Sequence, residues 1–540
     1  WGDRAVNVDR VCVVSVMASA ANNVRSITKA ASADARVLIV ALGVTDGVEL
    51  RPALELGGSL MKRGGIQVTV ATHLRFKSLV KNCEGIRFVD AGLDPGMARR
   101  STDAGKALEK VKSNPGLVGS ALHAFVETLV SNWFGEGIRL LVGAEDCKGG
   151  SFDMVVLASP ASYFVYASIC DEYALATAVL DANPIVPTKN FPPPKAFRGV
   201  AAVRSEPTCE GQWAIYGQSL WRFLYRDAVN ASRRHFLGLE PYTSPVGPME
   251  AVSTYSSSAP LVLLGYSSAL LPRPKEWPSH VHVVGPCVGG LGPLPEHDVT
   301  ARTLPDAVRE FFAKDMALPV VCCFFGPVGD HWADPPARNT LMLQCLEAFT
   351  LAKVRAIVVT PASTQLPGEY LVDGFRVLQL PALPVGSELV LYRKCALVVC
   401  SGDPWTLQAS LLAGTPVLPV RFSGGHSAES QAHNNNEASA EAEFWGRASA
   451  AKGVGAPCAA ADLSATSLGR LVRRLVNPDA PERKACREMA AAMQAAAEVP
   501  DNAKGGGKKG GQHVGLGKAV KLVSDLALPI AALRVAGVST

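Results

Sequence analysis

One stretch of the chain combines a buried strand, a polar turn and a helix start, an arrangement that binds phosphate in many α/β proteins. Residues 397–400 form a short apolar, β-branched run, and residues 401–403 interrupt it. Asp403 occupies the position expected of an N-cap, Pro404 that of a first helical residue, and Gly414 ends the pattern. A helix N-terminus presents unpaired N–H groups and the positive end of its dipole. The turn is therefore predicted to bind a nucleotide phosphate.

The same turn also carries residues that oppose phosphate binding. Asp403 would place a negative charge beside the phosphate, and Trp405 is large at a point where the backbone must approach closely. The alternative interpretation is a well-capped helix that binds no ligand. Ser401 and Thr406 still offer hydroxyl groups to a ligand, so both interpretations stay open.

Other patterns that could do chemistry are weaker. His280 and His282 alternate with valines, so both imidazoles face one side of a strand, but no further metal ligands accompany them at a supporting spacing. The sequence has no GxSxG elbow, P-loop or HExxH motif, and no GxGxxG follows residue 40 or residue 399. Trp277 and Trp445 are interpreted as packing residues. We therefore expect no bound metal, and an NAD-dependent enzyme is disfavoured.

Alternating strand and helix patterns place these residues in two α/β series. The first series opens with a strand at 36–41, a helix at 53–62 and a strand at 67–71, which together make a βαβ unit. Its further elements are strands at 154–157, 199–203, 260–264 and 280–284 and helices at 162–179 and 213–236. The second series contains strands at 319–325, 356–360 and 375–380 and a helix at 339–351, followed by the strand, turn and helix described first.

Length and composition indicate a globular protein of two domains. A chain of 540 residues exceeds what one core usually fills. The net charge of +5 (53 − 48) is spread thinly, without a basic stripe, which disfavours nucleic acid as a partner. The 13 cysteines show no repeated CxxC spacing, and no apolar run is long enough to span a bilayer. We expect a cytoplasmic protein with reduced thiols that contacts membranes, if at all, peripherally.

The predicted fold class is α/β, with two Rossmann-like domains that face each other across a cleft. The predicted domains are an N-terminal extension at 1–35, a first domain at 36–285, a Gly/Pro-rich linker at 286–305, a second domain at 306–480, and C-terminal helices at 481–540 that pack back on the first domain. For residues 11–21, a strand or extension is preferred over a signal-peptide core. Residues 423–443 and the Gly/Lys-rich residues 501–512 are expected to be inserted loops, with a short helix at 514–526.

The segment at residues 264–285, LGYSSALLPRPKEWPSHVHVVG, resembles the GYSP-LVPKP-DWP-HVHVTG segment of the sterol 3-beta-glucosyltransferases. Further stretches similar to motifs of that family lie at 43–48, 71–73, 187–192, 325–326, 395–406 and 444–446. The resemblance covers about residues 36–526 and implies the two-domain GT-B fold, with the acceptor bound by the first domain and the nucleotide sugar by the second.

The resemblance also implies a reaction and a set of site residues. It implies transfer of glucose from UDP-glucose to the 3-hydroxyl of a sterol or similar lipid, with inversion and without a bound metal or cofactor. Asp46 would take the proton of the acceptor hydroxyl, with His73 as a second candidate base. Their alternatives are a turn dipeptide and a half-buried structural histidine, respectively. The implied donor-binding residues are Gly43, Gly326, Ser401, Gly402, Asp403, Thr406, Glu441 and Trp445, and the implied acceptor-binding residues are Pro187, Thr188 and Phe191.

The departures from the family's motifs fall on its reactive positions. In the segment at 395–406, Cys400 and Ser401 replace a pair of histidines, and Asp403, Pro404 and Trp405 replace small residues. Elsewhere, Pro327 replaces a serine, and Glu441 and Ala442 replace an Asp-Gln pair. The Asp46-Gly47 dipeptide is a transposed Gly-Asp. The second hypothesis is therefore a catalytically degenerate GT-B protein that acts as a lipid-binding or scaffold module. Binding of the nucleotide sugar distinguishes the two hypotheses.

Overall fold

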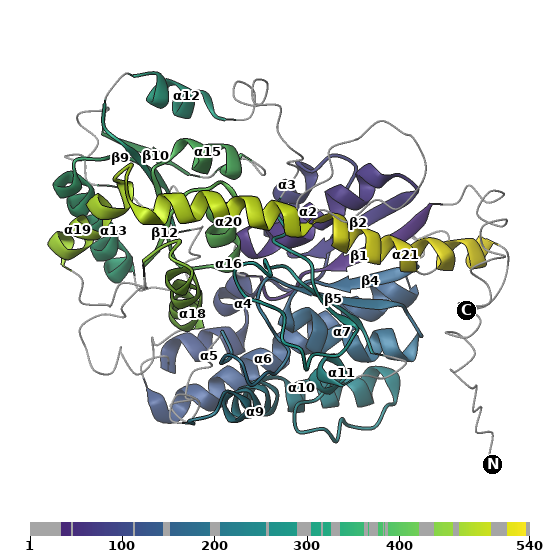
Figure 1. Ribbon diagram of the computed structural model, residues 1–540. Coiled ribbons are helices and arrows are strands. Elements are labelled where there is room, and N and C mark those ends of the chain that lie inside the picture. Colours follow the sequence, from purple (N-terminus) through teal and green to yellow (C-terminus); the bar gives the residue numbers. More distant parts are fainter. Residues whose placement is uncertain are drawn as a thin grey trace, which may run out of the picture.

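The computed structural model contains two parallel β-sheets, each covered by helices on both faces (Figure 1). The described residues are 34–44, 47–111, 114–143, 152–194, 206–254, 259–288, 304–314, 317–325, 335–360, 366, 376–381, 383, 387–420, 437–456, 464–497 and 516–535. The expected α/β class with two sheets is confirmed.

The first sheet has seven parallel strands in the order β3-β2-β1-β4-β5-β6-β7. The strands are β1 Ala35–Val40, β2 Ile66–Thr72, β3 Arg87–Asp90, β4 Met154–Leu157, β5 Thr177–Asp181, β6 Leu261–Leu264 and β7 Val281–Val283. On the central strand β1, Val37 and Ile39 join the core on one face and Leu38 and Val40 the core on the other. This two-sided burial explains why the strands appear in the sequence as continuous apolar runs.

Helices cover this sheet on both faces. They are α2 Gly47–Arg63, α3 Lys77–Lys81, α4 Pro95–Ser101, α5 Asp103–Val111, α6 Pro115–Ile138, α7 Pro160–Glu172, α9 Cys209–Leu220, α10 Arg226–Ser232 and α11 Met249–Ser253. Short helical turns extend or join them. These are η1 Leu74–Phe76, η2 Arg139–Gly143, η3 Trp221–Tyr225 and η4 Arg233–Leu237.

Two of the helices expected in this half need correction. The helix expected at 162–179 ends at Glu172, and Thr177–Asp181 is the strand β5. Ala174 adopts a left-handed conformation (φ 49) just after the helix, and no glycine or proline marks this reversal of the chain in the sequence. The helix expected at 213–236 is α9 and α10 with two π turns, closed by Gly238 at φ 66. The strand expected at 199–203 lies outside the described residues.

The second sheet has five parallel strands in the order β10-β9-β8-β11-β12. The strands are β8 Val320–Phe324, β9 Arg355–Val359, β10 Val377–Leu380, β11 Leu397–Cys400 and β12 Val417–Pro419. The helices are α12 Asp306–Ala313, α13 Pro335–Ala352, α15 Glu388–Lys394, α16 Pro404–Leu412, α18 Glu437–Ala451, α19 Ala465–Val476, α20 Pro481–Ala497 and α21 Leu516–Val535. The strand order reverses between β8 and β11. The turn after β11 therefore lies at a topological switch point, where ligands bind in open α/β sheets.

The two segments expected as inserted loops have different outcomes. The segment at 423–443 is corrected in its last part, because α18 begins at Glu437. Its Ala-rich sequence carries helix propensity without a clear apolar stripe, and tertiary contacts supply the rest. Residues 423–436 and the segment at 501–512 lie outside the described residues.

The last helix, α21, packs against the first sheet and not the second. Its residues Leu516, Ala519, Val523 and Ala527 share a core with β1 and α2. Arg534 pairs with Asp153 at 3.4 Å, and Lys518 donates to the Val283 carbonyl at 3.1 Å. Figure 1 shows α20 and α21 following one another across both halves of the molecule.

No helix in the described part of the chain has the length and apolar character needed to cross a membrane. The domain boundaries stay predictions, since residues 289–303 of the expected linker and residues 1–33 of the expected extension are not described.

Candidate functional site

The turn between β11 and α16 has the geometry that the sequence predicts. Asp403 is the N-cap of α16 (φ −61, ψ 140), and its Oδ1 accepts from the Thr406 N–H at 2.7 Å. Gly402 adopts φ 82, and a Cβ atom there would lie 2.4 Å from the Cα of Ala442 in α18. Glycine is therefore required at this position both by its backbone conformation and by the close approach of α18.

The start of α16 offers little to a phosphate. Pro404 has no N–H, the Thr406 N–H is taken by the Asp403 side chain, and the Leu407 N–H donates to the Asp403 carbonyl at 3.1 Å. Among the first four helical residues, the N–H of Trp405 is left for a ligand. Burial raises the pKa of the Asp403 carboxyl, while its hydrogen bonds to Thr406 and Ser401 oppose that rise. The carboxyl thus occupies the place that a phosphate takes at an uncapped helix start.

Trp405 is enclosed between the two halves of the molecule. Its side chain is 4% exposed, and its indole Nε1 donates to the Cys287 carbonyl at 3.1 Å. The guanidinium carbon of Arg51, from α2, lies 4.8 Å from the centre of the Trp405 ring. Arg51 also forms a buried ion pair with Glu388 of α15 and donates to the Leu383 carbonyl at 3.4 Å.

Gln408 continues this contact one turn further along α16. Its Oε1 accepts from the Ser267 N–H at 2.7 Å, and its Nε2 donates to the Pro404 carbonyl at 3.1 Å. Ser267 follows β6 of the first sheet. The N-terminal part of α16 is therefore docked on the first half through a buried amide as well as through Trp405.

Glu441 and Trp445 lie one turn apart on α18 and meet Asn183, which follows β5. The Asn183 Nδ2 donates to Glu441 Oε1 at 2.6 Å, and the Trp445 Nε1 donates to Asn183 Oδ1 at 2.9 Å. Trp445 is fully buried, so the prediction that it packs is confirmed. Both side chains therefore bind the side-chain amide of Asn183 in the first half, and α18 carries them beside the turn at Gly402.

His73 is a buried residue with both ring nitrogens near backbone groups. Nε2 accepts from the Gly43 N–H at 3.0 Å, and Nδ1 lies 3.4 Å from the Gly92 carbonyl. These contacts select the tautomer with the proton on Nδ1. Burial lowers the pKa of His73 below its usual 6.5, so the ring is neutral at neutral pH. The geometry fits the structural alternative, since the basic nitrogen already holds the loop that starts at Gly43.

Two of the predicted residues cannot be placed. Asp46, the first candidate base, and Gly326, a predicted donor residue, lie outside the described residues. The nearest described neighbours are Val44, which follows Gly43, and Gly47, where α2 begins.

The predicted acceptor residues sit in an aromatic cluster. Thr188 Oγ1 donates to Glu276 at 2.6 Å, the Trp277 Nε1 donates to the Pro187 carbonyl at 3.0 Å, and the Trp213 Nε1 donates to the Phe191 carbonyl at 2.9 Å. The Phe191 ring meets Trp277 edge-on at 6.0 Å and Phe444 of α18 at 5.8 Å. Trp277 is therefore a packing residue, as predicted. The cluster joins the acceptor loop to the helix that carries Glu441.

Comparisons with known proteins find similar glycosyltransferases. No known family model matches the chain. It is 24% identical over 472 residues to a sterol 3-beta-glucosyltransferase of Arabidopsis thaliana, covering 84% of this chain and 65% of that enzyme. It is 24% identical over 400 residues to a terpene cyclase-glycosyl transferase fusion protein of Humicola fuscoatra. This match covers 72% of this chain and 28% of the fusion protein. The chain therefore spans less than two thirds of the length of these relatives.

Solved glycosyltransferase structures show the fold. The match to Os79 from O. sativa, solved in complex with UDP, covers 91% of this chain and 100% of Os79. Its TM-score is 0.56 at 15% identity. The match to CalG4, the calicheamicin glycosyltransferase, covers 91% of this chain and 98% of CalG4. Its TM-score is 0.55 at 14% identity. The chain has the GT-B fold and is similar in sequence to sterol 3-beta-glucosyltransferases.

The structure brings together one group of the predicted residues. Gly402, Asp403, Thr406, Glu441 and Trp445 gather where α16 and α18 meet the first half, with Ser401 beside them, whereas Pro187, Thr188 and Phe191 are joined to that group through Phe444. Sequence reasoning missed Arg51, Asn183, Glu388 and Gln408, which make the polar contacts between the halves. A charged or amide residue inside an otherwise apolar helical pattern is the one signal that could have singled out Glu388 and Gln408.

Proposed function

We propose that this relative of the sterol glucosyltransferases is a glycosyltransferase that moves glucose from UDP-glucose to the 3-hydroxyl of a sterol or similar lipid. The observation that carries the proposal is the match of both halves to sterol glucosyltransferases together with the GT-B fold. In this proposal the second half binds the nucleotide sugar at the turn after β11, and the first half binds the lipid beside the loop at Pro187. The protein works in the cytoplasm and meets membranes peripherally, where its acceptor resides.

The proposed reaction is an inverting displacement at the anomeric carbon. Asp46 takes the proton of the acceptor hydroxyl, the oxygen of that hydroxyl forms the new glycosidic bond, and the bond to the diphosphate breaks with UDP as the leaving group. No metal or other cofactor takes part in the proposed reaction. The dipole of α16 and nearby donors stabilise the departing charge.

A specific observation favours the second hypothesis, a GT-B protein without catalytic activity. The Asp403 carboxyl caps α16, and Trp405 is buried against the Cys287 carbonyl, so the start of the helix is already occupied. In this alternative, the chain keeps the fold and the lipid-facing loop and acts as a binding or scaffold module.

The deciding experiment is a calorimetric titration of the full chain with UDP and with UDP-glucose, together with a transfer assay using radiolabelled UDP-glucose and a sterol in detergent micelles. Binding of both nucleotides and labelled sterol glucoside support the enzyme. Sterol binding without any binding of UDP compounds supports the non-catalytic module and overturns the transferase proposal.

The Asp46→Asn variant tests the proposed base within the same assay. Transfer should fall by about 10²- to 10⁴-fold, the usual contribution of general acid–base catalysis, while UDP affinity stays unchanged. Equal transfer by the variant and the wild type would remove Asp46 from the mechanism.

A further inference from the structure

Two large apolar side chains of the first half are exposed on neighbouring helices. Phe223 and Leu117 are the most exposed large apolar residues in the described part of the chain, at 60% and 53%. Phe223 lies in η3, within the helical segment that runs from α9 to η4, and Leu117 lies in the first turn of α6. Single exposed apolar residues are ordinary, whereas a group of them on one face marks an interaction site.

Two contacts fix how α6 lies against the segment from α9 to η4. His123 Nε2 lies 4.0 Å from Asp227 Oδ2, and the Phe134 ring stacks on the Phe236 ring at 5.7 Å. The residue numbers increase together in both contacts, so the two helices run side by side in the same direction. In Figure 1, α6, α9 and α10 lie together near the lower border of the molecule.

This register places the two exposed side chains at the same end of the helix pair. Phe223 stands one turn before Asp227 and is therefore level with about residue 119, so Leu117 lies about 3 Å from it along the axis. In both helices the exposed residues recur at helical spacing, Leu117, Ser120 and Ala124 in α6 and Phe223, Asp227 and Arg234 in the other. Phe223 and Leu117 therefore belong to one outward face.

This end of the pair is apolar, with cations at its margin. Residues 115–126 and 211–221 contain no aspartate, glutamate, lysine or arginine. Nearby positions carry half-exposed apolar side chains, Val118, Ala121, Leu122, Leu224 and Tyr225. Arg222, beside Phe223, and Lys110, in the last turn of α5, are exposed. An apolar patch bordered by cations complements a phospholipid surface, where phosphates lie above the acyl chains.

The helical segment that carries Phe223 also reaches the loop proposed to bind the acceptor. Trp213, in α9, donates its Nε1 N–H to the Phe191 carbonyl at 2.9 Å. Trp213 and Phe223 are separated by ten residues of helix, about 15 Å at 1.5 Å per residue. A membrane in contact with Phe223 would therefore lie about 15 Å from the residues that anchor this loop.

We propose that the apolar patch formed by Leu117, Phe223 and their half-exposed neighbours inserts into the surface of a phospholipid bilayer, with Arg222 and Lys110 at the level of the phosphates. This inference rests on the proposed function and deepens it, since it names the face through which a transferase with a lipid acceptor meets its membrane. Apolar side chains that enter the acyl region leave water, and the phosphates attract the cations. Two inserted side chains give a reversible attachment.

The test measures co-sedimentation of the full chain with vesicles of phosphatidylcholine and phosphatidylserine. The double variant Leu117→Ser/Phe223→Ser is compared with the control Tyr173→Ser/Leu351→Ser, which removes exposed apolar surface elsewhere. The patch variant should bind at least about tenfold more weakly, and the control should retain wild-type binding. Thermal unfolding checks that both variants fold. The conservative variant Phe223→Leu should keep most of the vesicle binding, because its side chain stays apolar.

A second measurement compares transfer to a sterol supplied in cyclodextrin with transfer to the same sterol in vesicles. The patch variant should match the wild type with cyclodextrin and fall with vesicles by the factor seen in binding. Equal losses in both formats would make the patch an acceptor contact and overturn the membrane assignment.

The proposal is also overturned if the wild type does not bind vesicles or if both double variants lose binding equally. Self-association that depends on the patch, seen by analytical ultracentrifugation together with unchanged vesicle binding, would assign the patch to a second copy of the chain instead. Vesicle binding through the patch in a protein that transfers no sugar would refute the proposed function alone, so the two failures are distinguishable.

Discussion

At the scale of single residues, Asp403 has two opposed effects on this site. Its side chain supplies the cap of α16, and its charge opposes a diphosphate at the same helix start. The amide of asparagine keeps the hydrogen-bond acceptor and removes the charge, so the two effects can be separated without introducing a glycine or emptying the space that Trp405 fills.

The Asp403→Asn variant should bind UDP more tightly than the wild type, by about 1 kcal/mol or a little more, because a like charge is removed from a partly solvated site. Its unfolding free energy should change by less than about 0.5 kcal/mol, since Asn and Asp cap helices about equally well. Calorimetry and urea unfolding measure the two quantities. The control Asp403→Ala should lose about 1 kcal/mol of stability through loss of the cap. Weaker UDP binding by Asp403→Asn would instead make the carboxylate a working donor contact.

The more drastic Asp403→Gly/Trp405→Gly change should still favour UDP binding, by about 1–3 kcal/mol given the energies of close charges. Its cost in stability is set by Trp405, whose buried indole bonds the Cys287 carbonyl. Removing a buried tryptophan costs about 3–5 kcal/mol, so this variant should unfold several degrees earlier in a thermal melt.

His73 should make the stability of the protein depend on pH. Its folded pKa lies below 6.5, so the unfolded state binds the proton more readily. The stability that His73 contributes is therefore present above about pH 6.5 and is lost as the pH falls below it. The His73→Leu variant should lose about 1–3 kcal/mol at pH 7.5, because the Gly43 N–H is left without its acceptor, and should lose less on acidification to pH 5.5. Urea unfolding at both pH values measures the two free energies, with His123→Leu, at a partly exposed histidine, as the control for the substitution itself.

At the scale of elements, the close packing of the β11–α16 turn on α18 depends on Gly402. Alanine there would place its Cβ 2.4 Å from the Cα of Ala442 and would require a positive φ. The Gly402→Ala variant should lose about 2–4 kcal/mol of stability and should also weaken any ligand that contacts α18, because the helix must move. In the control Gly58→Ala, the new Cβ meets no atom within 4 Å inside α2, and a gain of about 0.5–1 kcal/mol is expected. Denaturant unfolding compares the two, and equal effects would contradict the packing argument.

At the scale of the whole molecule, the two halves are joined by buried polar contacts as well as by apolar packing. The ion pair between Arg51 and Glu388 connects α2 of the first half with α15 of the second, and both side chains are almost fully buried. Such a pair adds little net stability when it is intact, but loss of one partner leaves a buried charge unpaired.

The Glu388→Gln variant should therefore cost about 3–5 kcal/mol and should loosen the contact between the halves. The double variant Arg51→Met/Glu388→Met should cost much less than the sum of its single changes, because no unpaired charge remains. Denaturant unfolding gives the energies, and small-angle scattering reports whether the radius of gyration increases. Additive energies in the double-mutant cycle would show that the pair does not couple the halves.

The local signals in the sequence determined the elements. The apolar run at Leu397–Cys400, the capping position of Asp403 and the proline after it sufficed to predict β11, the turn and α16, because strand burial and helix capping are set by neighbouring residues. The match to the GYSP-like segment at 264–285 indicated the family, which the comparisons support. The helix boundary at Glu172 and the strand β5 were missed, because the chain reverses at Ala174, where no glycine or proline marks the turn.

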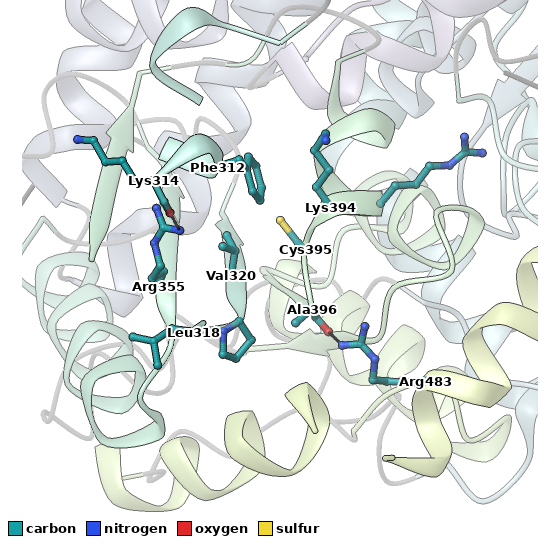
Figure 2. Close-up of a pocket in the computed structure, with 11 residues that line it drawn as sticks. Phe312, Lys314, Leu318, Val320, Arg355, Lys394, Cys395, Ala396 and Arg483 are labelled. Carbon is teal, nitrogen blue, oxygen red and sulfur yellow. Dashed lines mark hydrogen bonds between the residues drawn. The ribbon is translucent and has the colours of Figure 1, made fainter. Parts of the chain in front are cut away.

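Only the tertiary structure decided which of these elements meet. Trp405 reaches Cys287, Glu441 and Trp445 reach Asn183, and Arg51 reaches Glu388, across separations of more than a hundred residues. A cavity where the strands of the second sheet begin likewise gathers side chains from α12, β9, α15 and α20 (Figure 2). No local pattern encodes such pairings. They follow from how two doubly wound sheets bury their apolar faces and then satisfy the polar groups left at the contact.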